Sequence, residues 1–260
     1  MDMQINIGNR INFFVKPYNK TALPLIAHIV AGVFGYAIFF GVLWLFYRSI
    51  ILSTIIAIFM VPMAIVLNIN MAKAKRLKKL MGQFKSLLES LVVSLQAGST
   101  DLDAFINALE DMRLMYSEQS DIAKEVNLII VKFSNRETIG EALEDFAKRS
   151  GLQDIILFAN VYKLIEGKGD KTSEIVIRTQ RILSDKIEIE TEIKTLASGA
   201  LMEINIIALV PILIVAVMGF MGGDLMSSLF TPVGNVVATI AIGIFIGAYA
   251  LGRKLANIKV

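Results

Sequence analysis

Residues 22–71, ALPLIAHIVAGVFGYAIFFGVLWLFYRSIILSTIIAIFMVPMAIVLNINM, contain a single Lys, Arg, Asp or Glu side chain, that of Arg48. A second region, residues 204–252, contains only Asp224. A helix needs roughly 20 apolar residues to cross the about 30 Å hydrocarbon core of a bilayer, so each region has room for two such helices. The sequence therefore predicts two transmembrane hairpins, one in residues 22–71 and one in residues 204–252.

The composition excludes several broad classes of protein. Of 260 residues, 55% are hydrophobic and only 19% are charged, which is too apolar for a soluble enzyme or a disordered tail. The chain has no Cys, which excludes a secreted disulfide scaffold and any metal site built on thiolates. A multi-pass membrane protein is the expected class.

The distribution of Lys and Arg predicts the orientation in the membrane, since cytoplasmic loops are enriched in these residues. Arg48 is the only one expected on the far side of the membrane. The other side holds eleven such residues close to the ends of the spans: Arg10, Lys16, Lys20, Lys73, Lys75, Arg76, Lys78, Lys79, Arg253, Lys254 and Lys259. We therefore expect the cytoplasmic side to hold residues 1–21, the segment 72–203 and the tail 253–260.

Segment 72–203 contains no Pro, and its apolar residues recur at helical spacing. The pattern predicts a bundle of about six helices inserted between the second and third spans, and an all-α fold for the whole chain. The run EVNLIIVKF (125–133) has strand propensity, but its spacing favours a helix. Beyond KAKRLKK (73–79) the segment is richer in acidic than in basic residues, which argues against a nucleic-acid partner.

Helix boundaries are indicated by glycines and by capping residues. Thr138 followed by Glu141 predicts a capping box at the start of one helix, and Ser150 with Gln153 predicts a second. Gly98, Gly151 and the pair Gly167 and Gly169 indicate helix ends, and Asp170 is expected to cap the last bundle helix. Because no Pro interrupts either passage, that last helix is expected to continue into the third span as a rod of about 75 Å, and the second span to continue into the bundle.

No catalytic, cofactor or metal site is expected. His28 is the only histidine and lies inside the first span, where a neutral, hydrogen-bonded role is favoured. The run EGKGDKT (166–172) differs from a phosphate-binding loop, because Asp170 separates the glycine from the lysine. Paired acids such as Asp101 and Asp103 have no His or Cys partners and are expected on solvated surface.

Three runs in the cytoplasmic segment resemble the F-domain family of type II secretion and type IV pilus systems: FKSLLESLVVSLQAGSTDLDAFINALEDM, ETIGEALEDFAKRSG and ANVYKLIEGKGDKTSEIVIRTQRILSDKIEIETEIKTLASGA. The resemblance covers roughly residues 50–255. With one such domain between two pairs of spans, the chain is similar to the inner-membrane platform proteins of tight-adherence (Flp) pili. By position, the family motifs fall on Gly98, Gly140, Leu143, Glu166, Gly167 and Gly169. The chain has Gly167-Lys168-Gly169 where many relatives have a Gly-Gly pair, and it lacks the second domain of the general secretion members.

The resemblance implies a non-enzymatic platform in the inner membrane of a prokaryote. Its implied partners are a cytoplasmic secretion ATPase, pilin-like subunits, membrane lipid, and either further copies of the chain or a second F-domain protein. A membrane subunit of a transport complex that docks a separate ATPase is the alternative. A permease would line its path with polar residues, and the spans offer few: Asn205, Asn235, Thr239 and some Ser and Thr.

The turn around Glu166 is the expected contact for the ATPase, because it lies at the start of the helix that leads into the third span. The competing interpretation is a plain connection whose glycines supply a positive φ. A plain connection would leave Glu166→Lys nearly silent, whereas a docking contact would be weakened by it.

Overall fold

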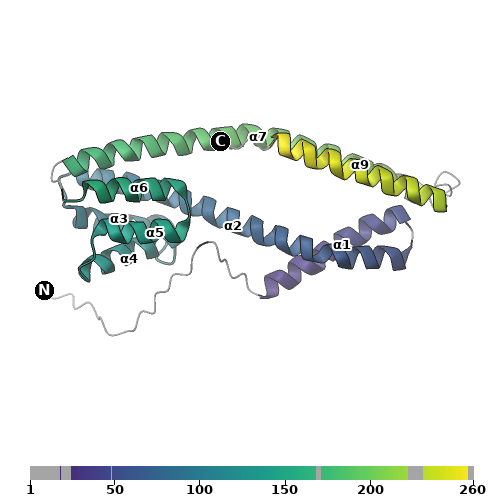
Figure 1. Ribbon diagram of the computed structural model, residues 1–260, viewed down its shortest axis with the longest axis horizontal. Coiled ribbons are helices and arrows are strands. Elements are labelled where there is room, and N and C mark those ends of the chain that lie inside the picture. The colour runs from purple at the N-terminus through teal and green to yellow at the C-terminus, as the bar shows by residue number, and fades with distance from the viewer. Residues whose placement is uncertain (1–17, 19–24, 48, 168–170, 222–230, 257–260) are drawn as a thin grey trace. The chain divides into compact units, whose positions relative to one another are not determined.

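A computed structural model describes residues 18, 25–47, 49–167, 171–221 and 231–256. Within these ranges the chain is helical and no strand is present, as the apolar periodicity predicts. The helices, labelled in Figure 1, are α1 (Leu25–Tyr47), α2 (Ile50–Gln96), α3 (Asp101–Tyr116), α4 (Asp121–Ser134), α5 (Ile139–Ser150), α6 (Gln153–Ile165), α7 (Lys171–Met221) and α9 (Pro232–Ala256). The run at 125–133 is confirmed as helix, within α4.

Four helices are long and apolar enough to cross a membrane: α1, α2, α7 and α9. They are the helices that contain the four apolar regions in which the spans were expected. Two of these helices are far longer than a membrane requires, since α2 has 47 residues and α7 has 51. Both are continuous through the passages that the sequence left free of proline, and their internal prolines, Pro62 and Pro211, lie within the apolar stretches.

The chain forms two compact units, which share α2 and α7. One unit, here called the bundle, contains Lys73–Gln180 together with Tyr18. The other contains Leu23–Ala72 and Arg181–Val260. Two of the crossings between the units, at residues 72–73 and 180–181, therefore lie inside helices rather than in loops.

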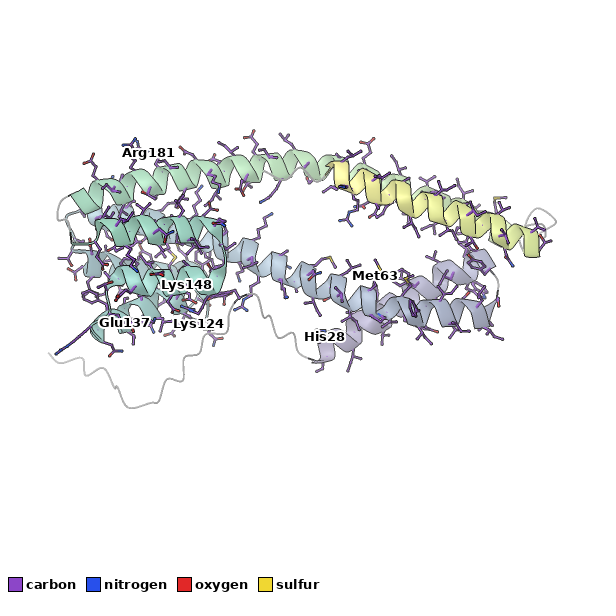
Figure 2. All side chains as sticks on the ribbon, in the orientation of Figure 1. His28, Met63, Lys124, Glu137, Lys148 and Arg181 are labelled. Atoms are coloured by element: carbon purple, nitrogen blue, oxygen red, sulfur yellow. The ribbon has the colours of Figure 1, made fainter. Side chains whose placement is uncertain are left out.

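The second unit exposes most of its large apolar side chains, such as Phe59 at 83% and Met63 at 57% (Figure 2). Small residues allow α1 and α2 to approach closely, because a Cβ placed on Gly35 would lie 2.6 Å from the Cβ of Ala64. His28 lies in the first turns of α1 and is half-buried (Figure 2). These features suit helices whose outer faces contact lipid.

Antiparallel helices build the bundle around an aromatic core. Figure 1 shows α3, α4, α5 and α6 side by side, and α2 lies antiparallel to α3 through the pairs Ser86–Tyr116 and Ser90–Asp111. The rings of Phe84, Phe146 and Phe158 are almost fully buried and meet edge to face. Such contacts add to the burial of apolar area in fixing the packing.

The alternating helix directions sort the loops of the bundle into two ends. The proximal end, where α2 enters the bundle near Lys73, holds loops 117–120 and 151–152. The distal end, where α2 finishes at Gln96, holds loops 97–100 and 135–138 and the turn at Glu166 and Gly167.

The caps agree with the sequence at one helix and differ at another. Thr138 and Glu141 form the expected capping box at the start of α5. The box expected at Ser150 and Gln153 is wrong: α6 has no side-chain cap, and its N-cap is Leu152. Ser150 still belongs to α5, where its hydroxyl donates to the carbonyl of Ala147, so it lies too early to cap α6.

Candidate functional site

The residues singled out from the sequence gather at the distal end of the bundle. Gly98 follows α2 with a φ of +85°, and Gly167 follows α6 with a φ of +77°. Gly140 and Leu143 lie in the first half of α5, and Leu143 is fully buried. Gly169 and Asp170, including the expected cap of α7, lie outside the described residues.

Gly98 ends α2 by allowing a left-handed residue where a side chain would be strained. Its N–H donates to the carbonyl of Leu95 at 3.1 Å, and the next N–H, of Ser99, donates to that of Ser94 at 3.1 Å. Carbonyls at the end of the helix are thereby satisfied, as in other glycine-terminated helices. The role of Gly98 in the described structure is to stop α2 and turn the chain toward α3.

Glu166 joins the end of α6 to the start of α5. Its carboxylate accepts hydrogen bonds from the backbone N–H of Ile139 at 2.8 Å and of Gly140 at 3.1 Å. These two N–H groups belong to the first turn of α5. The N–H groups in the first turn of a helix have no hydrogen-bond partner within the helix, and they favour a nearby negative charge. Glu166 is therefore a cap for α5 supplied from another helix.

Gly140 is required by that contact. A Cβ on Gly140 would lie 2.6 Å from Oε2 of Glu166 and 3.0 Å from Cα of Lys163. The contact with Oε2 is under 3.0 Å, a distance that real Cβ atoms essentially never show, so the Glu166 carboxylate would have to move off the N–H groups that it caps. At 3.0 Å from Lys163 Cα, the backbone of α6 would also have to give by a few tenths of an ångström. Gly140, Leu143 and Glu166, chosen separately from the sequence, thus form one packed junction between α5 and α6.

An ion-pair cluster reinforces the same junction from outside. Glu144 of α5 pairs with Lys148 of its own helix and with Lys163 of α6. The ammonium groups of Lys148 and Lys163 lower the pKa of Glu144 to about 2. A depressed carboxyl pKa contributes stability above the unfolded value near 4.5 and loses that stability as the pH falls toward about 2.

Because Glu166 caps α5, the variant Glu166→Lys should affect folding as well as any docking contact. Reversal would place a cation on the N-terminus of α5 and remove two charge-assisted hydrogen bonds, each contributing about 1.5–3 kcal/mol. A structural role therefore also carries a large cost, and Glu166→Lys does not separate docking from folding. A test of docking needs exposed neighbours instead.

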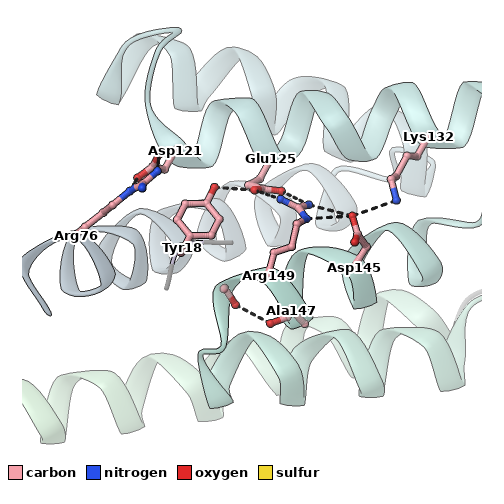
Figure 3. Close-up of polar contacts among 9 residues, drawn as sticks. Tyr18, Arg76, Asp121, Glu125, Lys132, Asp145, Ala147 and Arg149 are labelled. Carbon is pink, nitrogen blue, oxygen red and sulfur yellow. Dashed lines mark hydrogen bonds and ion pairs between the residues drawn. The ribbon is translucent and has the colours of Figure 1, made fainter. Parts of the chain in front are cut away.

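A second polar cluster, at the proximal end, was not predicted from the sequence. Glu125 of α4 is fully buried, and Arg149 of α5 donates to both of its carboxylate oxygens (Figure 3). Arg149 also pairs with Asp145, which pairs with Lys132. A signal existed: Glu125 lies on the apolar face of α4, three residues after Ile122 and four before Ile129.

Among the described residues, no group of three or more His, Cys, Asp or Glu side chains could hold a metal ion. Comparison with family models, with curated proteins and with solved structures finds no match to this chain. The resemblance to the F-domain family therefore rests on the sequence runs quoted above.

Proposed function

We propose that this chain is an inner-membrane platform of a type IV or Flp-type pilus, or of a type II secretion machine. In this proposal a cytoplasmic secretion ATPase acts on the bundle, and the movement reaches the spans beside which pilin subunits are assembled. The observation that carries the proposal is the continuity of α2 and α7, each of which joins a membrane-length apolar stretch to a bundle segment. A scaffold that transmits displacement needs such connections, because a flexible linker would absorb it.

The exposed part of α7 is stabilised as a helix in its own right. Lys186 and Lys194 both pair with Glu190, at 3.7 Å and 3.3 Å, one turn away on either side. Each i,i+4 pair contributes roughly 0.2–0.5 kcal/mol to an isolated helix. These pairs support a rod through a stretch that includes exposed Ile189 and Leu196.

Polar contacts between the long apolar helices argue against the transport alternative. Two of the polar groups in these helices are engaged between helices: the hydroxyl of Tyr47 contacts that of Thr239 at 2.7 Å, and the hydroxyl of Tyr249 donates to Asn205 at 2.8 Å. The Oδ1 atom of Asn235 is buried without a hydrogen-bond partner among the described residues. Polar side chains in this setting act as contacts between membrane helices. This use favours a scaffold over a polar pathway.

Sidedness has support beyond the Lys and Arg count. Tyr18 packs in the bundle, and only residues 19–24 separate it from α1. Seven residue steps reach at most about 25 Å, which is less than the about 30 Å of hydrocarbon. The bundle and the start of α1 should therefore face the same side of the membrane, which the proposal takes as the cytoplasm.

We expect single cysteines, introduced into this cysteine-free chain, to report that orientation. Ser49, between α1 and α2, and Glu118, between α3 and α4, are both exposed. A membrane-impermeant maleimide should label Ser49→Cys in intact cells and Glu118→Cys only after lysis. Labelling of Glu118→Cys in intact cells would contradict the orientation.

The ATPase contact is proposed at the distal end, where the turn at Glu166 and the loop 135–138 meet. Glu137 and Glu118 are both exposed glutamates in loops, at the distal and proximal ends respectively, so they form a matched pair. A photo-crosslinking residue at Glu137 should capture the secretion ATPase in native membranes, and one at Glu118 should not. Capture from Glu118 alone would place the ATPase contact at the proximal end. Capture from neither position would remove the ATPase from the proposal.

A further inference from the structure

The basic run KAKRLKK (73–79) directly follows the apolar stretch of α2. Residues 50–72 carry no charge and, at about 1.5 Å per residue, are roughly 34 Å long as a helix, which matches the about 30 Å of hydrocarbon in a bilayer. The helix continues without a break through the basic run, so Lys79 lies only about 10 Å beyond the apolar stretch. The charges of the run therefore lie at the level of the lipid headgroups.

One member of the run, Arg76, is used by the bundle. Its guanidinium makes two hydrogen bonds to the carboxylate of Asp121 in α4, at 2.8 Å and 2.9 Å, and its side chain is half-buried (Figure 3). Leu80, one turn further along α2, is fully buried. Arg76 and Leu80 therefore mark the side of α2 that packs on the bundle.

Lysines of the same run have no counter-charge. Three of them are exposed and share one face of α2, since residues three and four apart are neighbours on a helix: Lys75, Lys78 and Lys79. Within the described ranges, none of the three side chains forms an ion pair or a hydrogen bond. No Asp or Glu occurs between Asp2 and Glu89, so no acidic residue of α2 lies within two turns of them. A counter-charge for these lysines has to come from the surroundings of the helix.

Exposed lysines elsewhere in the chain differ in this respect. Lys186 and Lys194 of α7 share Glu190 on their own helix, at 3.7 Å and 3.3 Å. Clusters of Lys and Arg beside the end of a membrane helix attract anionic lipids, and each cation near the surface adds to the attraction. Uncompensated cations at headgroup level therefore fit a headgroup with a net negative charge better than a zwitterionic one.

We propose that Lys75, Lys78 and Lys79, here called the lysine face, bind the headgroups of anionic phospholipids. Their ammonium groups donate to the phosphate oxygens, while their methylene stems lie along the apolar end of the helix. Such contacts fix the depth and the rotation of α2 where it leaves the hydrocarbon. The count of Lys and Arg predicts only which side of the membrane the run faces, whereas the lysine face predicts which lipid it selects. The lysine face does not depend on the proposed function, because it follows from α2 and its charges alone.

Lipid selection can be measured by native mass spectrometry of the full-length protein in detergent micelles, where the orientation in a membrane plays no part. The probes are phosphatidylglycerol and phosphatidylcholine with the same acyl chains. The protein should retain the anionic lipid with a several-fold preference, and excess inorganic phosphate should not displace it. Equal retention of the two lipids would overturn the proposal, and displacement by phosphate would show a site for the free ion instead.

Variants of the same protein locate the preference. In Lys75→Gln/Lys79→Gln the preference should fall by a factor on the order of five or more, because two surface cations are lost. The matched control, Lys186→Gln/Lys194→Gln, removes the same charge beside Glu190 and should leave the preference unchanged. Lys75→Arg/Lys79→Arg should keep the preference, because it keeps the charge. An unchanged preference in the first variant, an equal loss in the control, or a loss in the arginine variant would contradict binding by the charges of the lysine face.

Discussion

Replacing Gly140 by alanine should destabilise the bundle by about 2–4 kcal/mol, although alanine is the better helix former. The added Cβ would lie 2.6 Å from Oε2 of Glu166 and 3.0 Å from Cα of Lys163. Either the carboxylate leaves the N-terminus of α5, with the loss of two hydrogen bonds, or α6 moves away from α5. The measurement is thermal or denaturant unfolding of the full-length protein, followed by circular dichroism.

The control is another helical glycine. Gly82 lies inside α2 with nothing within 4 Å of the position of an added Cβ. Gly82→Ala should therefore be neutral or stabilising by up to about 1 kcal/mol. If both variants had the same stability as the wild type, the close approach at Gly140 would not limit the packing of α5 on α6.

A double-mutant cycle tests the reason for that effect. If Gly140 is required because Glu166 needs space, then removing the carboxylate should relieve part of the conflict. Glu166→Ala and Gly140→Ala should therefore be clearly less than additive, as expected for residues in contact. Full additivity of the two changes in unfolding free energy would show that the cost of Gly140→Ala does not arise from its contact with Glu166.

Much of this fold is determined by local rules that a sequence displays. Apolar runs predicted the four long helices, and the Pro-free passages predicted that two of them continue into the bundle. Spacing identified α4 in spite of its strand-forming residues. The capping box at Thr138 was predictable because both of its members lie within one turn. The capping box at Ser150 and Gln153 was predicted wrongly. The pattern does not reveal that Ser150 still belongs to the preceding helix, α5.

The junction between α5 and α6 and the cluster around Glu125 depend on contacts that sequence spacing does not reveal. Gly140 and Glu166 are 26 residues apart, and Tyr18 and Glu125 are 107 apart. A resemblance to known motifs indicated that Gly140 and Glu166 matter, but only the antiparallel packing of α5 and α6 shows that they touch. For Glu125 the apolar face of α4 held a usable signal, whereas for Tyr18 the sequence held none.

The connection between the units can be tested by breaking α7. A proline at Thr195 would remove the N–H that bonds to the carbonyl of Thr191 and would place a ring against that carbonyl, at a cost of about 3 kcal/mol or more. Pro211 is already present in α7, but within its apolar stretch, so Thr195→Pro asks whether the exposed stretch must be continuous. If the chain is the platform proposed above, the variant should insert in the membrane with an intact bundle and should fail in pilus or secretion assembly.

The break itself can be measured apart from assembly. Ile182 and Met202 are both exposed on α7, and cysteines there carry spin labels separated by about 30 Å along a continuous helix. The distance distribution should be narrow in the wild type and in Thr195→Ala, which loses only a side-chain contact to Thr191, and broad in Thr195→Pro. A broad distribution together with normal assembly would show that the spans and the bundle work through a flexible joint. A narrow distribution in Thr195→Pro would show instead that α7 tolerates the proline, so that assembly by this variant reports on an unbroken rod. Failure of assembly in Thr195→Pro alone, with a broad distribution and normal Thr195→Ala, is the result that a transmitting rod requires.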